Sequence, residues 1–328
     1  MRKLAMMLIS LVIIASMAFA MSATAFATHT HTRLTASAGI VIDFETGMVL
    51  YAHNADEMMV PASMIKILAV AVVLEAIEDG RITFDTRVQT SYAIASFSVD
   101  RRFSNVPMPV GSSFTVRELV DAVMQVSAGA ATVALGELLY GSEAAFVRRM
   151  SEKVESFGLE AEVADSWGIS PNNRISAYNM AQLARAIIRE YPIILEISAQ
   201  STINFNNIAY NSTNRLLGNF YGLDGLKTGF TNAAGWCFVG TAMRGGRRLV
   251  AVAMNSSTVS SRFSDTSTLL NYGFTNYNAT FTRHFRSQIE PMNDEVVIGN
   301  ALVPISLYSD LEYRELFTFL QMMSMLND

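Results

Sequence analysis

A long apolar run follows a short polar motif in the first quarter of the chain, and it restricts the possible folds more than any other segment does. Pro61 begins the motif Pro-Ala-Ser-Met-Ile-Lys, and residues 67–74 read Ile-Leu-Ala-Val-Ala-Val-Val-Leu. Proline suits a first helical turn and Asp79-Gly80 suits a helix end, so the pattern predicts a helix over Pro61–Glu78. A helix with almost no polar face must be covered on all sides. We therefore expect it to be the central, buried helix of the fold.

Two polar residues of this motif, Ser63 and Lys66, lie three positions apart and therefore share one face of the helix. Burial lowers the pKa of a lysine toward the range in which its free amine can accept a proton from a hydroxyl. The pair thus has the composition of a serine nucleophile with its base. An N-cap serine beside a lysine whose charged end reaches solvent has the same spacing, so both interpretations stand at this point.

The composition of the 328-residue chain excludes several functional classes. A hydrophobic fraction of 51% and a net charge of −5 indicate a folded globular protein, either one large domain or one domain with an appendage. The basic residues are scattered, so we expect no nucleic-acid partner. Cys237 is the only cysteine and lies in an apolar, strand-like context, which predicts a core residue and no internal disulfide. The histidines form no ligand-like group except His29 and His31 near the N-terminus, so we expect no metal site.

The N-terminal residues have the pattern of an export signal. A basic start at Arg2-Lys3 precedes a hydrophobic run over residues 4–20, and Ala25-Phe26-Ala27 fits a cleavage site. Ala18-Phe19-Ala20 fits as well, but cleavage near Ala27 leaves a polar mature end. An uncleaved anchor is the alternative, although the run is near the lower length limit for a membrane span. We predict that the mature protein works outside the cytoplasmic membrane, in the cell wall or periplasmic space.

Strand-like runs at both ends of the main part of the chain enclose a block of helical segments. A helix is expected to begin at Thr115, where Glu118 completes the spacing of a capping box. Further helices are expected from near Ala130, from Ser142, from Ser176 and over 266–272. Strands are expected at 38–43, 48–51, 226–230, 235–243 and 249–254. The arrangement predicts an α+β fold with an antiparallel sheet flanked by helices, whose edge strands come from distant parts of the sequence. Short strands near 295–299 and 302–307 follow. The tail at 316–323 lacks the basic face of a membrane-surface helix, which argues against membrane attachment.

Two further segments complete a set of three motifs. Lys227-Thr228-Gly229 lies on a predicted strand, where a lysine and a hydroxyl beside a glycine can hold an anionic group. Ser127 lies at the junction of two predicted helices, where a side chain can face the central helix. Together with Ser63 and Lys66, these motifs resemble those of the penicilloyl-serine transferases, which comprise penicillin-binding proteins and serine β-lactamases.

Within that set the chain resembles the D-alanyl-D-alanine carboxypeptidases of the S11 peptidase family. The resemblance extends from about Ala38 to Asn276, nearly the whole predicted catalytic region of the mature protein. The segments that carry it are Asp43-x-Glu45-Thr46-Gly47-x-Val49-Leu50, Pro61-Ala62-Ser63-x-x-Lys66, Thr115-Val116-Arg117-Glu118-Leu119, Asp224-Gly225-Leu226-Lys227-Thr228-Gly229-Phe230-Thr231 and Gly273-Phe274. So many matched segments in the same order predict membership of the family and its β-lactamase-like fold.

The resemblance implies a two-step acyl transfer. Ser63 would attack the carbonyl of the penultimate D-alanine of a peptidoglycan stem peptide, with Lys66 as its base. Ser127 would relay a proton to the leaving D-alanine. The backbone N–H groups of Ser63 and Phe230 would form the oxyanion hole. Water would then release the acyl-enzyme without a cofactor, and β-lactam antibiotics would be covalent inhibitors.

The family also implies a binding site for the terminal carboxylate of the peptide. Lys227, Thr228 and Gly229 would form it, helped by Arg262, which falls where the family has an arginine after its second hairpin. The implied processes are cell-wall peptidoglycan biosynthesis and the maintenance of cell shape. The corresponding division of the chain is a signal peptide over 1–27, a mature N-terminal segment over 28–37, a catalytic domain over 38–278 and a shortened C-terminal β-like extension over 279–328.

Several positions depart from the family's pattern. Gly129 replaces the asparagine of the second motif and therefore offers no side chain to hold Lys66, and Trp167 replaces a histidine in the irregular loop over 165–173. Asn172 or Asn173 could stand in for the missing asparagine. One alternative function is therefore a penicillin- or peptidoglycan-binding relative with little turnover. A β-lactamase is less favoured, because residues 165–174 contain no glutamate to activate a water molecule.

Overall fold

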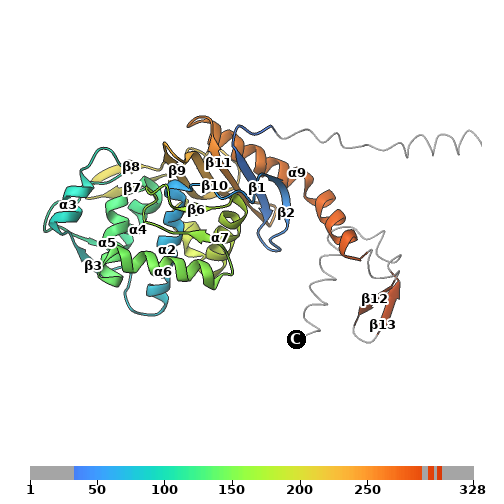
Figure 1. Ribbon diagram of the computed structural model, residues 1–328, viewed down its shortest axis with the longest axis horizontal. Helices are drawn as coiled ribbons and strands as arrows, with labels where there is room; N and C mark the ends of the chain where they lie inside the picture. Colours follow the sequence, from blue (N-terminus) through green and yellow to red (C-terminus); the bar gives the residue numbers. More distant parts are fainter. Residues whose placement is uncertain (1–32, 290–294, 299–300, 305–328) are drawn as a thin grey trace, which may run out of the picture. The chain divides into compact units, whose positions relative to one another are not determined.

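Residues 33–289, 295–298 and 301–304 are described in the computed structural model of the chain (Figure 1). The predicted signal peptide over 1–27 and the tail over 316–323 lie outside these described residues. Among the helices of the described part, none combines the length and the apolar character that a membrane crossing requires.

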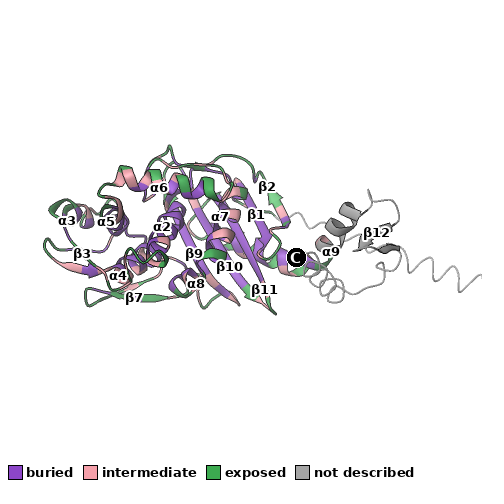
Figure 2. Cartoon of the chain, turned by 90° about the horizontal axis from the view of Figure 1, so that it is seen from below, coloured by how far each residue is buried: buried purple, intermediate pink, exposed green. Residues whose placement is uncertain are grey.

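The predicted central helix forms in two parts. Its first turn is the 3₁₀ segment η1 (Ala62–Ile65), and the α-helix α2 (Lys66–Glu78) continues from it. Residues 67–74 are at most 2% exposed, because α5 (Gly129–Tyr140), α6 (Glu143–Ser156) and α7 (Ala177–Glu190) pack around α2. Figure 2 shows α2 as buried between the other helices and the sheet. The prediction of a buried central helix is confirmed.

A five-stranded antiparallel sheet lies beside the helical block, in the strand order β2-β1-β11-β10-β9. Its strands are β1 (Ala38–Asp43), β2 (Val49–His53), β9 (Leu223–Thr231), β10 (Gly235–Arg244) and β11 (Arg247–Ser256). Alternate residues of β11 enter different cores: Val250 and Val252 join the cluster around α2, whereas Ala251 and Ala253 pack with α9 (Ser261–Ile289). Because side chains alternate along a strand, both faces of the sheet are covered, and the predicted α+β class is confirmed.

The helix predicted to begin at Thr115 has the expected capping box. Thr115 Oγ accepts a hydrogen bond from the Glu118 N–H at 3.1 Å, and Glu118 Oε2 accepts one from the Thr115 N–H at 2.7 Å, at the start of α4 (Val116–Asp121). The helix then widens into a π-helical turn, η2 (Ala122–Val126), which the sequence did not predict. That turn ends at Ser127 in a left-handed backbone conformation.

Several short elements appear where the sequence pattern was too brief to show a period. They are β3 (Arg87–Gln89), α3 (Tyr92–Ser98), β4 (Ser113–Thr115), β5 (Ala161–Glu162), β6 (Arg174–Ile175), α8 (Ile193–Ser198), β7 (Thr202–Phe205) and β8 (Ile208–Asn211). Short elements of this kind are stabilised by tertiary packing rather than by propensity.

The last predicted helix is longer than expected. The pattern indicated residues 266–272, whereas α9 begins at Ser261 and ends at Ile289, so the domain boundary expected after residue 278 falls inside this helix. Beyond it in the sequence, β12 (Glu295–Ile298) and β13 (Ala301–Pro304) form an antiparallel hairpin. β12 lies within the strand expected at 295–299, and β13 overlaps the one expected at 302–307 but begins at Ala301.

Candidate active site

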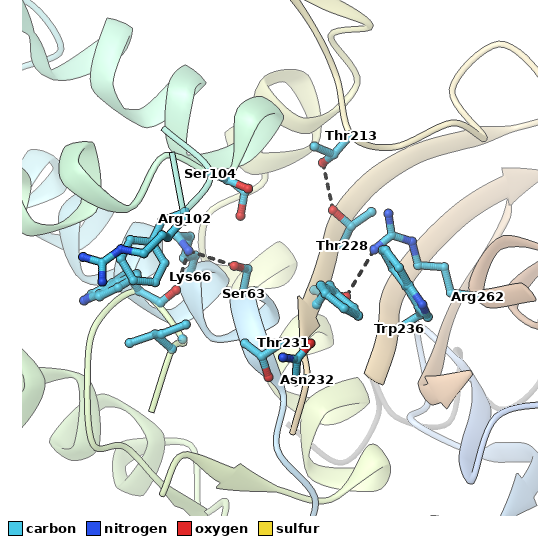
Figure 3. A pocket seen from close by; sticks show the side chains of 17 residues that line it. Ser63, Lys66, Arg102, Ser104, Thr213, Thr228, Thr231, Asn232, Trp236 and Arg262 are labelled. Carbon is cyan, nitrogen blue, oxygen red and sulfur yellow. Dashed lines mark hydrogen bonds between the residues drawn. The ribbon is translucent and has the colours of Figure 1, made fainter. Parts of the chain in front are cut away.

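Ser63 and Lys66 face each other at the start of the central helix. Lys66 Nζ donates a hydrogen bond to Ser63 Oγ at 2.9 Å and a second one to the main-chain carbonyl of Trp167 (Figure 3). Lys66 is 1% exposed, so its charged end does not reach solvent, and the Ser63 side chain does not cap the helix. The interpretation as a nucleophile and base is therefore favoured over the structural one.

Burial changes the protonation of Lys66. Desolvation lowers the pKa of its ammonium to about 7, although the nearby negative charge of Asp165 opposes the shift. A lysine with a pKa in this range has a substantial fraction of free amine at neutral pH, and only the free amine can accept the Ser63 proton.

Two glycines, Gly168 and Gly229, pack closely against the backbone around Ser63. A Cβ on Gly168 would lie 2.9 Å from the Ser63 nitrogen, and one on Gly229 would lie 3.2 Å from the same atom and 2.7 Å from the Pro61 carbonyl oxygen. Side chains at these positions would therefore push η1 away from the irregular loop and from β9. Ala62, directly before Ser63, has a φ of 49°, a left-handed conformation that costs free energy and is common at functional sites.

Ser127 enters the same region from the π-helical turn. Its φ of 67° and its 5% exposure show a constrained, buried residue, and its Oγ has no hydrogen-bond partner within the described part of the chain. A buried hydroxyl without a partner is uncommon in folded proteins. Here the hydroxyl borders an open cavity, where a bound molecule can supply the missing partner.

Strand β9 and helix α9 contribute the predicted anion-binding residues. Thr228 Oγ lies 2.8 Å from the Oγ of Thr213, and Arg262 Nη1 donates a hydrogen bond to the Gly229 carbonyl at 3.2 Å (Figure 3). Burial lowers the pKa of Arg262 to about 10. Burial, together with the charges of Lys66 and Arg262, lowers the pKa of Lys227 well below its ordinary value.

These basic side chains have no acidic partner at close range. In the part of the chain that the structure describes, no carboxylate lies within 4.0 Å of Lys66, Lys227 or Arg262. The Nε atom of Arg262 is also buried without a hydrogen-bond partner there. Burying a charged group without a partner is costly, so an anion bound here would supply the counter-charge that Arg262 lacks.

A cavity of about 460 Å³ connects these residues. Of the predicted site residues, it is lined by Ser63, Lys66, Ser127, Thr228, Gly229, Phe230 and Arg262. Lys227 is 1% exposed and does not line the cavity, and its Nζ contacts the carbonyl of Thr228 at 3.2 Å. Seven of the eight predicted site residues therefore line one cavity, whereas Lys227 does not.

Sequence reasoning missed more than half of the cavity wall. The additional residues are Arg102, Phe103, Ser104, Trp167, Gly168, Ile169, Thr213, Thr231, Asn232 and Trp236. Most come from loops without periodicity, and only Thr231 belongs to a segment that carried the resemblance to the family. For Trp167-Gly168, the departure from the family's His-Gly was the only available signal.

Aromatic rings, and not the side chain of another amide residue, fill the space beside Gly129. A Cβ on Gly129 would lie 3.0 Å from both Phe97 Cζ and Trp167 Cε3. Neither candidate substitute fills the role of an asparagine there. Asn172 is exposed, and Asn173 binds its own loop, accepting from the Ala164 N–H at 2.8 Å and donating to the Ser170 carbonyl at 3.3 Å.

Comparison with known proteins is consistent with this site. A model of the peptidase S11 family, described as D-alanyl-D-alanine carboxypeptidase, matches residues 24–258. D-alanyl-D-alanine carboxypeptidase DacF of Bacillus subtilis is 31% identical over 248 residues, which cover 74% of this chain and 63% of that protein. DacD of Escherichia coli is 31% identical over 261 residues, or 76% of this chain and 66% of that protein. The match thus spans less than two thirds of either relative.

Solved structures agree with the fold and the family. Penicillin-binding protein 5 of Haemophilus influenzae superposes with a TM-score of 0.71 at 31% identity, over 74% of this chain and 72% of that one. Penicillin-binding protein D2 of Listeria monocytogenes, solved in its ampicillin-bound form, superposes with a TM-score of 0.66 at 31% identity, over 74% of this chain and 98% of that one. The chain therefore belongs to the S11 family of D-alanyl-D-alanine carboxypeptidases.

Proposed function

We propose that this chain is a serine-type D-Ala-D-Ala carboxypeptidase that removes the terminal D-alanine from peptidoglycan stem peptides. The observation that carries the proposal is the contact of 2.9 Å between Lys66 Nζ and Ser63 Oγ inside a cavity with buried positive charge. The relatives named as D-alanyl-D-alanine carboxypeptidases support it. We further propose that the chain is exported by residues 1–27 and acts in cell-wall synthesis outside the cytoplasmic membrane.

In the proposed acylation step, Ser63 Oγ forms a bond to the carbonyl carbon of the penultimate D-alanine while its proton passes to the free amine of Lys66. The main-chain N–H groups of Ser63 and Phe230 stabilise the resulting oxyanion. As the peptide bond breaks, a proton reaches the nitrogen of the leaving D-alanine through Ser127. Water then adds to the acyl carbon and restores the Ser63 hydroxyl, with Lys66 again taking and returning a proton.

β-Lactams are proposed as covalent inhibitors by the same attack. Ser63 Oγ would open the lactam ring, and the ring nitrogen would take the proton. The ampicillin-bound structure of the Listeria monocytogenes relative supports this proposal. A β-lactamase is not favoured, because the single carboxylate of residues 165–174, Asp165, already accepts main-chain hydrogen bonds and does not line the cavity.

The proposal is tested by incubating the protein with a diacetyl-lysyl-D-alanyl-D-alanine peptide and, separately, with a fluorescent penicillin. A carboxypeptidase releases D-alanine at a constant rate and forms a covalent fluorescent adduct. Labelling without D-alanine release would instead identify a penicillin-binding protein with little turnover, the alternative function suggested by Gly129 in place of the family's asparagine. The absence of both reactions would refute the proposed function.

Acylation is expected to depend on pH with a midpoint near 7. Because burial lowers the pKa of Lys66 to about 7, the free amine that accepts the Ser63 proton prevails above this pH and the ammonium prevails below it. The rate constant of labelling by fluorescent penicillin should therefore rise about tenfold from pH 6 to pH 8, following the free-amine fraction. A rate that is constant over this range, or that falls with rising pH, would exclude Lys66 as the base.

Replacing Arg262 by leucine is expected to weaken the binding of substrates with a terminal carboxylate. Arg262 is 7% exposed, lines the cavity and has an unpartnered Nε. Since hydrogen bonds to charged groups contribute about 1.5–3 kcal/mol, KM for the peptide should rise by about 10-fold or more, with a smaller change in kcat.

The matched control for this variant is Arg102→Leu, which removes another arginine of the same cavity wall. Arg102 is already paired with Asp100 at 2.6 Å and its side chain is 80% exposed. Equal increases of KM in the two variants would show that Arg262 acts through general positive charge rather than by binding the carboxylate.

A further inference from the structure

The Asp165 carboxylate accepts four of the hydrogen bonds that fix the irregular loop lining the cavity. Asp165 is 9% exposed, and its Oδ1 accepts main-chain N–H hydrogen bonds from Trp167 at 3.0 Å, from Gly168, and from Ile169 at 3.3 Å. Its Oδ2 accepts one from the Ser170 N–H. Four donors converging on one carboxylate fix the path of this turn, because each hydrogen bond to a charged acceptor is stronger than a neutral one.

This turn supplies a hydrogen-bond acceptor to the proposed base. The carbonyl of Trp167, in the middle of the turn, accepts a hydrogen bond from Lys66 Nζ, which also contacts Ser63 Oγ at 2.9 Å. Within the described residues, these are the contacts that orient the Lys66 side chain. A carbonyl displaced from this position would leave the amine free to rotate away from Ser63.

The side chain of Trp167 is held by contacts with other aromatic rings. Its ring packs edge-on against Phe97, with 4.8 Å between ring centroids, and against Phe103 at 5.0 Å. Gly129 provides the space for this cluster, since a Cβ there would come within 3.0 Å of the Phe97 and Trp167 rings. The indole ring of Trp167 can therefore pack here only because residue 129 has no side chain.

We propose that Asp165 is a positioning residue for Lys66: its carboxylate fixes the turn over residues 165–170, and the turn holds the Trp167 carbonyl against Lys66 Nζ. Gly129 belongs to this arrangement because it leaves room for the ring of Trp167. The lysine is thus oriented by a main-chain carbonyl from a loop instead of by a side chain at position 129. The role of Lys66 as a base rests on the proposed function, whereas its orientation by the turn does not.

The charges around Lys66 give this arrangement a measurable consequence. Asp165 lies on the loop side of Lys66 and favours its ammonium form. The basic groups Lys227, on β9, and Arg262, on α9, face this region as well. Asp165→Asn removes the negative charge, and its amide nitrogen cannot accept the N–H of Ser170. Both changes remove stabilisation of the ammonium, so the pKa of Lys66 should fall. If the substitution merely loosened the loop and admitted water, the pKa would rise toward that of an exposed lysine.

Few lysines compete with Lys66 in such a measurement. The lysines of the chain are Lys3, Lys66, Lys153 and Lys227. The protein with lysine labelled by ¹³C at Cε can therefore be titrated by NMR, with the Lys66 signal assigned by its loss in Lys66→Met. We expect the midpoint of Lys66 in Asp165→Asn to lie about one pH unit below that of the wild type. The pH midpoint of penicillin acylation should move in the same direction.

The matched control is Glu143→Gln. Glu143 binds the same turn from α6, since its Oε1 accepts from the Ser166 N–H at 3.3 Å and from the Ser166 hydroxyl at 3.0 Å. It accepts none of the hydrogen bonds that the N–H groups of residues 167–170 donate to Asp165. Its amide can still accept these hydrogen bonds, so the Lys66 midpoint should not change. An unchanged or raised midpoint in Asp165→Asn, or an equal shift in both variants, would overturn the proposal. Because the NMR titration needs no catalysis, it decides the proposal even if wild-type protein does not react with penicillin.

A second pair of variants tests the arrangement if Asp165→Asn fails to fold by circular dichroism. Gly129→Ala should displace the ring of Trp167 and with it the carbonyl, and so shift the Lys66 midpoint. In a Trp167→Ala background the ring is absent, and the same Gly129→Ala change should leave the midpoint unaltered. Equal shifts in the two backgrounds would show that position 129 acts on Lys66 independently of Trp167, and would overturn the proposal.

Discussion

Replacing Ser63 by alanine is expected to abolish both penicillin labelling and D-alanine release, with acylation reduced by about 10⁴-fold or more. The Ser63 hydroxyl is the group in hydrogen-bond contact with Lys66 Nζ, and both side chains line the cavity. Without that oxygen no covalent intermediate can form, and the remaining groups can only bind the substrate. The labelled peptide in the wild type, identified by mass spectrometry, should contain Ser63.

The change should leave the fold intact, because the lost hydroxyl is small and Lys66 keeps its hydrogen bond to the Trp167 carbonyl. A suitable control is Ser264→Ala, which removes an exposed serine hydroxyl that donates to the Ser261 carbonyl at 3.0 Å. This control should be labelled like the wild type. Residual labelling of Ser63→Ala at a comparable rate would show that another residue is the nucleophile.

Replacing Gly168 by alanine is expected to damage both stability and activity. Gly168 has a φ of 83°, and an added Cβ would lie 2.2 Å from the Ala62 carbonyl oxygen and 2.9 Å from the Ser63 nitrogen. These are main-chain atoms, which cannot rotate away. The unfavourable backbone conformation and the overpacking should together lower the free energy of unfolding by about 2–5 kcal/mol. The displaced nucleophile should lower the acylation rate constant by roughly 100-fold.

The control variant Gly158→Ala separates the cost of the left-handed backbone conformation from the cost of overpacking. Gly158 has a similar φ of 67°, but nothing lies within 4 Å of an added Cβ. The control should therefore lose only about 1–2 kcal/mol of stability, measured by urea unfolding, and should acylate normally. Equal stability losses in the two variants, with normal acylation in Gly168→Ala, would show that Gly168 does not constrain the nucleophile.

The sequence predicted the elements whose signals are local. The apolar run after Lys66 indicated a buried helix, and α2 is that helix. Thr115 and Glu118 indicated a capping box, and both of its hydrogen bonds are present. Such features depend on spacing within a few residues, so a single chain contains enough information to recognise them. The helix α8 lacked such a signal, because it has six residues and begins directly after Pro192, close to the end of α7.

The wall of the cavity was harder to predict for a physical reason. Phe103, Ile169 and Thr213 are brought together from three loops by the packing of helices and strands elsewhere. Loop residues of this kind carry no periodic pattern, and their side chains alone do not indicate a common site. Only the residues of the three motifs, such as Ser63 and Ser127, and those implied by the family resemblance, Phe230 and Arg262, could be assigned to the cavity in advance.

What the sequence by itself determined is the identity of the chemical groups: a serine and a lysine on one helical face, a strand with Lys227 and Thr228, and a glycine at position 129. Only the tertiary structure decided how Lys66 is held. Its partner is the carbonyl of Trp167, and every residue has a carbonyl, so no pattern of side chains could indicate it. The space opposite Gly129 is likewise filled from a distant loop. Contacts of this kind are set by long-range packing of the whole domain, and therefore become visible only in the folded chain.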